Sequence, residues 1–264
     1  TQKKLEKYNI TRIPLKVSIA GEEFLDQVEL TTEKFLDKLE ATDELPTTSQ
    51  PALGKFIDVY ENLADDYDQI LSLHLSGKFS GTVKTAHTAS NMVEGAEIKV
   101  IDSETVTAPL GVIVTEVAKA AQQGKSMREL VELVEQLKEQ VNLYFTVDEL
   151  DYLEKGGRIG KAAAFLGNLF KIRPLLTVED GEVCPYKKIR GERRLYKSFL
   201  ELAAELRGAG TNNLIILHGR CKDKADILKD KLTNQYDWDT VEVQKFGTVV
   251  GSHVGPTPFG MVIW

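Results

Sequence analysis

The chain has 264 residues, of which 42% are hydrophobic and 28% charged, as is usual for a soluble globular protein with one large or two modest domains. A formal net charge of -7 argues against an extended nucleic-acid surface or stable membrane insertion, and the apolar runs are too short to span a bilayer. Cys184 and Cys221 have no CxxC partner and no nearby histidine, which favours free thiols over a disulfide or a zinc site. We therefore expect a cytoplasmic protein without a secretory signal.

Predicted helices and strands alternate through the first half of the chain. A helix at residues 2–8 leads into a half-buried strand at 13–19, where Pro14 favours an edge position. Further helices are predicted at 31–39, 51–64, 83–93, 108–123 and 126–137, and strands at 70–75, 98–101 and 143–147. This order predicts a three-layer α/β/α domain with a mainly parallel sheet over residues 1–150. Such a domain usually begins with a strand, so its first strand is apparently missing.

The second half has a different pattern. Three glycines and Arg158 within residues 153–160 indicate a domain boundary and hinge, and a short apolar helix is expected at 162–170. Asp180-Gly181 lies between two apolar runs and predicts a β-hairpin. Helices at 192–206 and 222–232, strands at 214–217 and 241–246, and the terminal apolar stretch 259–264 complete a second α/β domain with a mixed sheet over residues 151–264.

Hydroxyl side chains occur in three loops at junctions between strands and helices: Thr47–Pro51, Phe79–Thr82 and Asp102-Ser103. Because the carboxyl ends of parallel strands meet at one sheet edge, we expect these loops to lie together. Hydroxyls and free helix N–H groups suit a carboxylate or a phosphate. Each serine could equally cap its helix, so both interpretations stay open.

Catalytic motifs are few. Ser80 lies at a strand-to-helix junction, but Lys78 stands where the G-x-S-x-G elbow requires glycine. Neither GxxxxGK[ST] nor GxGxxG occurs at a strand-to-helix turn, and no metal-ligand spacing is present. His253 lies in a loop rich in Gly and Pro, where it could donate to an anion or hold the loop. A ligand-binding protein is favoured, with an acyl hydrolase that uses Ser80 and His253 as the alternative.

Basic residues form a cluster in this acidic protein. The cluster contains Lys187, Lys188, Arg190, Arg193 and Arg194. Such a run is ordinarily a solvated face, but next to the hydroxyl loops it could attract a phosphate or an acidic partner. Arg158 allows the same two interpretations.

Five motifs together resemble the DegV family. They are Thr48-Ser49-Gln50-Pro51, Ser80-Gly81-Thr82, the stretch from Leu153 to Ile159, the stretch from Lys161 to Gly167, and His253-Val254-Gly255-Pro256. The motifs occur in the family's order and span essentially the whole chain. The resemblance implies a two-domain α/β protein that encloses a long-chain fatty acid in a tunnel. It also implies that the bacterial protein presents the carboxylate to a separate ATP-dependent fatty acid kinase subunit, whose acyl phosphate product supports phospholipid synthesis.

The resemblance also implies roles for individual residues. Thr48, Ser80 and His253 match the positions that bind the carboxylate. Arg190 and Arg193 match, more loosely, positions that meet the kinase, and Arg158 is a third candidate for that surface. The family binds a fatty acid as ligand and is implied to have no cofactor, metal or catalytic set of its own.

Two further groups are expected near the ligand. Additional loop and N–H donors next to the carboxylate are Ser49, Gly81 and Thr82. Candidates for the tunnel wall are Phe165, Leu166 and Leu169, although their helical spacing fits an ordinary core equally well.

Overall fold

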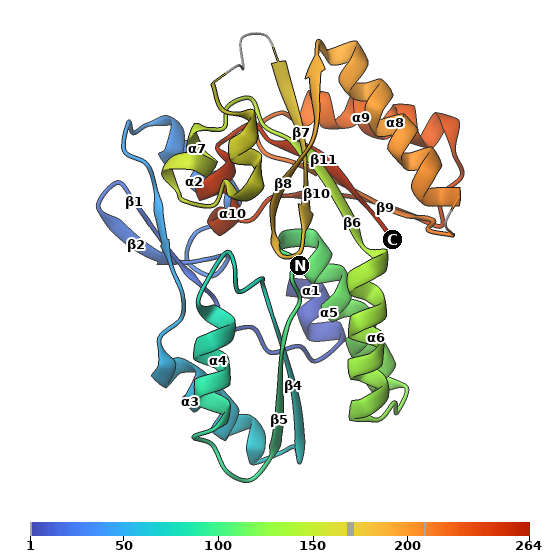
Figure 1. Cartoon of the computed structure of the whole chain (residues 1–264). Coiled ribbons are helices and arrows are strands. Elements are labelled where there is room, and N and C mark those ends of the chain that lie inside the picture. The colour runs from blue at the N-terminus through green and yellow to red at the C-terminus, as the bar shows by residue number, and fades with distance from the viewer. Residues whose placement is uncertain (1, 168–171, 209) are drawn as a thin grey trace.

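The strands of the protein form three sheets in this computed structural model, which describes residues 2–167, 172–208 and 210–264 (Figure 1). The largest is a six-stranded mixed sheet in the order β10-β9-β11-β6-β7-β8. Its strands are β6 (Asn142–Thr146), β7 (Ile172–Glu179), β8 (Glu182–Arg190), β9 (Asn213–His218), β10 (Thr240–Lys245) and β11 (Phe259–Ile263). The inner strands β9 and β11 are apolar and buried along most of their length, which is typical of strands covered on both faces.

Two long helices, α8 (Glu192–Gly208) and α9 (Lys222–Gln235), cover one face of this sheet. Phe199 and Leu228 belong to the buried cluster on that face, together with Phe259 and Met261 of β11. Shorter elements lie against the other face: α7 (Asp151–Lys155), the 3₁₀-helix η1 (Gly160–Phe165) and α10 (Thr248–Val254).

A second sheet pairs β4 (Gln69–His74) with β5 (Glu97–Asp102) in parallel. Helices α3 (Leu53–Ala64) and α4 (Thr82–Ser90) pack on one face, where Phe56 and Tyr60 are buried. Helices α5 (Thr107–Gln122) and α6 (Met127–Gln140) pack on the other, through Ile113 and Val134. This part of the chain therefore has three layers, and the predicted α/β class with a parallel and a mixed sheet is confirmed.

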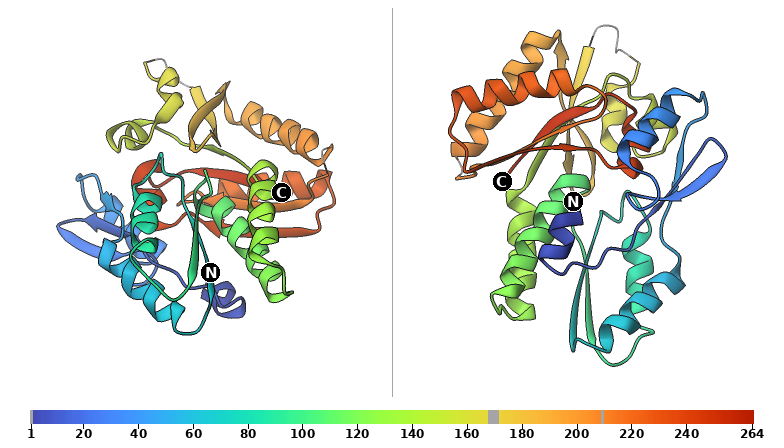
Figure 2. Two further views of the ribbon diagram at one scale, coloured as in Figure 1. Left: turned by 60° about the horizontal axis from the view of Figure 1, so that its bottom comes forward. Right: turned by 180° about the vertical axis from the view of Figure 1, so that it is seen from behind.

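The third sheet is antiparallel, in the order β2-β1-β3, and it packs against the second half of the chain. Its strands are β1 (Lys16–Ile19), β2 (Glu22–Leu25) and β3 (Thr47–Ser49), with α2 (Thr32–Glu40) beside them. Thr32 Oγ1 donates to the Phe246 carbonyl at 3.1 Å, and Tyr152 of α7 packs on the buried cluster of this sheet. The remaining helix, α1 (Gln2–Lys7), lies beside α5 (Figure 2).

Four local expectations were wrong. The segment Thr47–Pro51, expected to be a loop, contains β3, which pairs with β1. The strand expected to end the first sheet, β6, instead lies between β11 and β7 in the six-stranded sheet. The strand expected at an edge, β1, is central, because Pro14 precedes its first residue and leaves both its edges free to pair. The helix expected at 162–170 is the short 3₁₀-helix η1, while Leu169 lies outside the described residues.

Candidate functional site

A cavity of about 330 Å³ lies where the three sheets meet. The third sheet contributes Thr48 to its lining, and the end of β4 contributes Leu75 and the loop after it. Its floor is the six-stranded sheet. Most of the lining is apolar and includes Leu75, Phe79, Leu143, Phe145, Val178 and Val183. A mainly apolar cavity with few polar groups is the usual form of a site for a small hydrophobic ligand.

Hydrogen bonds hold the polar lining groups in place. Thr48 Oγ1 lies 2.9 Å from His253 Nε2, joining β3 to α10. Gln50 Nε2 donates to Thr85 Oγ1 at 2.6 Å, so the loop after β3 is held against α4. A Cβ at Gly81 would lie 2.2 Å from Gln50 Oε1, so any larger residue there would displace the Gln50 side chain. The first two hydroxyl loops therefore meet, as the sequence predicts.

Ser80 belongs to a tight turn at the N-terminus of α4. The backbone N–H groups of Phe79 and Ser80 both donate to the Ser76 carbonyl, at 3.0 and 3.2 Å. Ser80 Oγ lies 2.8 Å from Thr82 Oγ1 and accepts the Thr82 N–H at 3.3 Å. Ser80 therefore accepts the N–H of the first residue of α4 from the position before its N-cap, Gly81, and it also lines the cavity.

His253 is neutral at neutral pH. Burial and, to a smaller extent, the positive charge of Arg158 together lower its pKa to about 4. Its Nδ1 is buried with no hydrogen-bond partner among the described residues and faces Gly156, where a Cβ would lie only 2.5 Å away. An unpaired acceptor costs less than an unpaired N–H, so we assign the proton to Nε2. That N–H then donates to Thr48 Oγ1, and the Thr48 hydroxyl keeps its own proton for a ligand.

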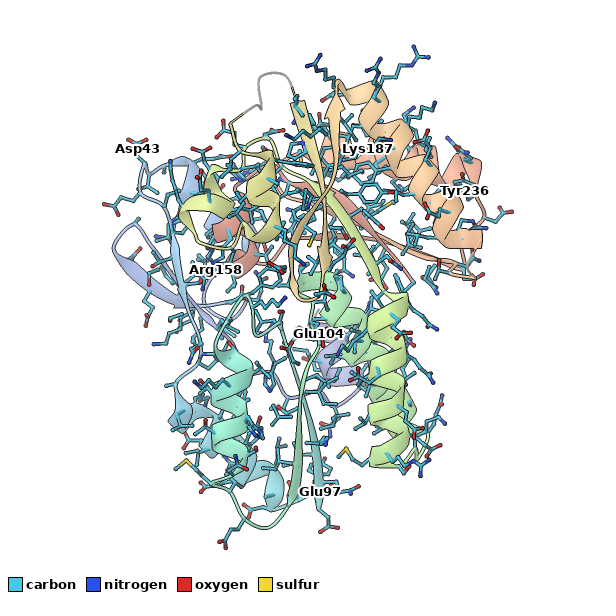
Figure 3. The ribbon with its side chains drawn as sticks, viewed as in Figure 1. Asp43, Glu97, Glu104, Arg158, Lys187 and Tyr236 are labelled. Atoms are coloured by element: carbon cyan, nitrogen blue, oxygen red, sulfur yellow. The ribbon has the colours of Figure 1, made fainter. Side chains whose placement is uncertain are left out.

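Arg158 supplies the only guanidinium among the lining residues. Its Nε donates to the Phe79 carbonyl at 3.1 Å, and Nη1 donates to the Gly156 carbonyl at 2.8 Å. It forms no ion pair with any residue that the structure describes. The other N–H groups of its guanidinium are available to an anion. Figure 3 labels Arg158 in the region between α7 and the loop before α4.

The predicted site residues divide into three sets. The cavity brings together most of the predicted head-group residues and Arg158: Thr48, Ser49, Ser80, Gly81, His253 and Arg158. Thr82 is buried behind Ser80. Arg190 and Arg193 are exposed at the end of β8 and the start of α8, on the side of the molecule where Figure 3 labels Lys187.

The apolar wall differs from the one that helical spacing suggested. Phe165 and Leu166 pack against the buried cluster around Phe145 but do not line the cavity. The lining residues that the sequence did not single out include Leu143 and Phe145 of β6, and Val178 and Val183 of the hairpin. Their alternation along the strands was the available signal, because residues two apart point to the same face.

The described part of the chain has neither a membrane-spanning helix nor a metal-binding cluster. None of its helices is long and apolar enough to cross a membrane. Within the same residues, no cluster of His, Cys, Asp and Glu side chains could hold a metal ion.

Comparisons with known proteins agree along the whole chain. A family model described as "Uncharacterised protein, DegV family" matches residues 1–264. A DegV domain-containing protein of Halalkalibacterium halodurans is 34% identical over 261 residues, covering 98% of this chain and 92% of that protein.

Two solved structures have the same fold. A DegV family protein from Thermus thermophilus, described as binding fatty acid, superimposes with a TM-score of 0.93 at 29% identity, covering 100% of this chain and 95% of that one. DegV of Bacillus subtilis, described as a fatty acid binding protein, gives 0.90 at 31% identity, covering 99% and 94%. The resemblance seen in the motifs is confirmed, and this chain belongs to the DegV family.

Proposed function

We propose that the protein binds one long-chain fatty acid in the cavity and presents its carboxylate to a separate ATP-dependent fatty acid kinase subunit, in support of phospholipid synthesis. The observation that carries the proposal is the apolar cavity with its cluster of Thr48, Ser80, His253 and Arg158. The fatty-acid binding described for the relatives from Thermus thermophilus and Bacillus subtilis supports the same ligand.

The chemistry of the cavity suits both ends of a fatty acid. Each methylene transferred from water to an apolar wall contributes about 0.8 kcal/mol, so a long acyl chain provides most of the affinity. A carboxylate that leaves water must keep its hydrogen bonds. The hydroxyls of Thr48 and Ser80 can donate hydrogen bonds to the carboxylate, and the loop amides near Gly81 add further donors. The positive charge of Arg158 offsets the negative charge of the carboxylate.

The same geometry favours binding over hydrolysis. A nucleophilic serine needs a base within hydrogen-bond distance and a third group that orients the base. Ser80 Oγ instead contacts Thr82, while His253 Nε2 contacts Thr48. His253 Nδ1 has no partner where a triad would have a carboxylate. We therefore propose a binding protein without a catalytic set.

We further propose that the kinase approaches the exposed basic cluster. Arg190 and Arg193 are exposed, and neither they nor Arg194 forms an ion pair with any residue in the described ranges. Arginines without an ion pair, on a protein whose net charge is negative, can bind an acidic surface of another protein or a partner that carries a nucleotide. Partnership with an ATP-using enzyme is expected in the cytoplasm.

Reconstitution with a fatty acid kinase subunit tests this function. The loaded protein should give acyl phosphate only when the kinase and ATP are both present. The double variant Arg190→Glu, Arg193→Glu should raise the KM of the kinase for the loaded protein about tenfold or more, because rim charges govern association. It should leave fatty-acid affinity unchanged. Arg128→Glu, which is also exposed but lies on α6, is the matched control. Equal KM values for both variants would contradict the proposed docking surface.

A further inference from the structure

The loop before α4 is tied to the tip of the β7–β8 hairpin. Ser76 Oγ donates to the Gly181 carbonyl at 2.6 Å, and the Ser76 side chain is buried. Gly181 has a φ of +78°, and a Cβ there would lie 2.4 Å from Ser76 Oγ. The turn thus requires glycine both for its backbone conformation and for this close approach.

Charges surround this hydrogen bond. Glu182 Oε1 lies 3.1 Å from Lys78 Nζ and 3.3 Å from Lys161 Nζ, so one carboxylate links the loop, the hairpin and η1. Both lysine side chains are more than half exposed. Their ion pairs are therefore screened by water and salt and are individually weak. We call this set of contacts among Ser76, Gly181, Glu182, Lys78 and Lys161 the latch.

The latch lies directly over the cavity. On the loop side, Leu75 and Phe79 flank the latch residues in sequence, and both line the cavity. On the hairpin side, Val178 and Val183 flank the tip and line the same cavity. In Figure 1 the hairpin points towards the loops at the ends of β4 and β5. A closed latch therefore covers the acyl cavity on this side.

The opposite side of the cavity is held more firmly. There the antiparallel sheet shares a buried apolar cluster with α2, and Tyr152 and Val249 pack against it. Buried hydrogen bonds add to this contact, including the one from Thr32 to the Phe246 carbonyl. On the latch side, Phe79, Val178 and Val183 also pack in a buried cluster, the one around Phe145. At the hairpin tip itself, the contacts to the loop are one buried hydrogen bond and exposed ion pairs, so the tip contacts separate at the lower free-energy cost.

We propose that the latch is the gate through which the acyl chain enters and leaves the cavity. This inference rests on the fatty-acid binding proposed above and adds the route and the moving parts. Separation of the hairpin tip from the loop exposes Phe79 and Val183, and closure returns them to the acyl chain. Exchange of the ligand is then limited by latch opening rather than by contact with the head group.

Release of a fluorescent long-chain fatty acid, chased with unlabelled ligand, tests the gate. Ser76→Ala removes the buried hydrogen bond, and Glu182→Gln removes the charge shared by both lysines. Each should speed release roughly fivefold, which corresponds to the loss of about one hydrogen bond. The matched controls are Thr115→Val, whose hydroxyl donates to a carbonyl within α5, and Glu132→Gln, which pairs with Arg128 on α6. The controls should release at the wild-type rate.

A covalent lock provides the opposite test. The double variant Lys78→Cys, Glu182→Cys joined by a short thiol cross-linker should retain preloaded fatty acid and exchange it at least tenfold more slowly than the same protein before cross-linking. Both native cysteines are buried. Two results would overturn the gate. One is release at the wild-type rate from both Ser76→Ala and Glu182→Gln, and the other is fatty-acid exchange in the cross-linked protein as fast as before cross-linking. If Ser76→Ala fails to fold, Glu182→Gln and the lock still decide.

Hydrogen exchange separates failure of the gate from failure of the proposed function. In the ligand-free protein, the hairpin-tip amides should exchange faster than those of β9, and faster still in Glu182→Gln. Tip amides that exchange only with global unfolding would refute the gate without reference to any ligand. A wild-type protein that binds no fatty acid, but whose tip opens, would instead refute the proposed function.

Discussion

Thr48 and His253 show how one hydrogen bond can set the chemistry of the proposed head-group site. A neutral imidazole that donates from Nε2 fixes the Thr48 oxygen as an acceptor and turns its proton towards the cavity. Burial keeps the pKa of His253 near 4, so the imidazole brings no charge. In the proposed site the positive charge is that of Arg158, which the sequence left open as a solvated residue, an anion-attracting group or part of a kinase surface.

Loss of a single hydroxyl tests this arrangement. Thr48→Val and Ser80→Ala should each weaken fatty-acid binding about tenfold, because a hydrogen bond to a charged group contributes roughly 1.5–3 kcal/mol. Affinity for the methyl ester of the same acid should change much less, since an ester carries no charge. Calorimetric titration of both ligands measures the difference.

Thr47→Val is the matched control, because Thr47 is exposed on β3 and does not line the cavity. Unchanged acid affinity in both Thr48→Val and Ser80→Ala would show that the carboxylate binds elsewhere.

The polar residues that line the cavity were easier to predict from the sequence than the apolar residues of its wall. Hydroxyls at strand-to-helix junctions mark a possible anion site in the sequence itself, and Thr48, Ser49 and Ser80 line the cavity. Leu143 and Val178 look like ordinary strand core, because their role depends on which face of the sheet stays uncovered. That property arises only when distant segments pack.

Local signals predicted the ends of elements well. Thr31 caps α2 and accepts the Lys34 N–H, and Ser126 forms the expected capping box with Glu129 at the start of α6. The Asp180-Gly181 turn forms with both residues at positive φ. These features depend on a few neighbouring residues, so one sequence contains all the necessary information.

The neighbours of a strand within its sheet were harder to predict than the ends of helices and turns, as β6 shows. Its apolar pattern predicts a buried strand correctly, but the choice between the two sheets depends on β7 and β11, which follow later in the chain. Order along the chain favoured the earlier sheet, since consecutive strands often pair. The six-stranded sheet buries Leu143 and Phe145 on one face, and the parallel sheet already has helices on both.

The packing of α7 on α10 gives a prediction about the stability of the fold and about ligand binding. A Cβ on Gly156, at the end of α7, would lie 2.5 Å from His253 Nδ1 and 2.7 Å from the Tyr152 carbonyl. Gly156→Ala should therefore destabilise the fold by about 1–3 kcal/mol, through overpacking, and weaken fatty-acid binding by moving His253. Denaturant unfolding and a binding titration would measure both effects.

Gly54→Ala in α3 is the control, because nothing lies within 4 Å of its added methyl. It should be neutral or slightly stabilising, as alanine favours helix. A Gly156→Ala protein as stable and as tightly binding as Gly54→Ala would contradict the assigned packing.

Across the whole molecule, three sheets surround one cavity, and the buried histidines link its stability to pH. Burial lowers the pKa of His74 to about 4, an effect that Asp102 partly opposes, and His253 has a similar value. Both folded-state values lie below the ordinary 6.5, so the unfolded chain binds more protons between these values. Stability should therefore be fully present above pH 6.5 and fall as the pH drops towards 4, by at most roughly 3 kcal/mol for each histidine.

Denaturant unfolding over this pH range checks the linkage. His74→Gln, which can keep a hydrogen bond to Ser72, should remove about half of the decline. A decline of the same size in His74→Gln and in the wild type would show that other groups cause it.

The ligand itself gives the most direct test of the central claim, that this cavity holds a fatty acid. Native mass spectrometry of the gently purified protein should show one added mass that matches a long-chain fatty acid. The added mass should be reduced or absent in the Thr48→Val, Ser80→Ala double variant. A wild-type protein that carries no lipid and gains none when mixed with long-chain fatty acids would contradict the account.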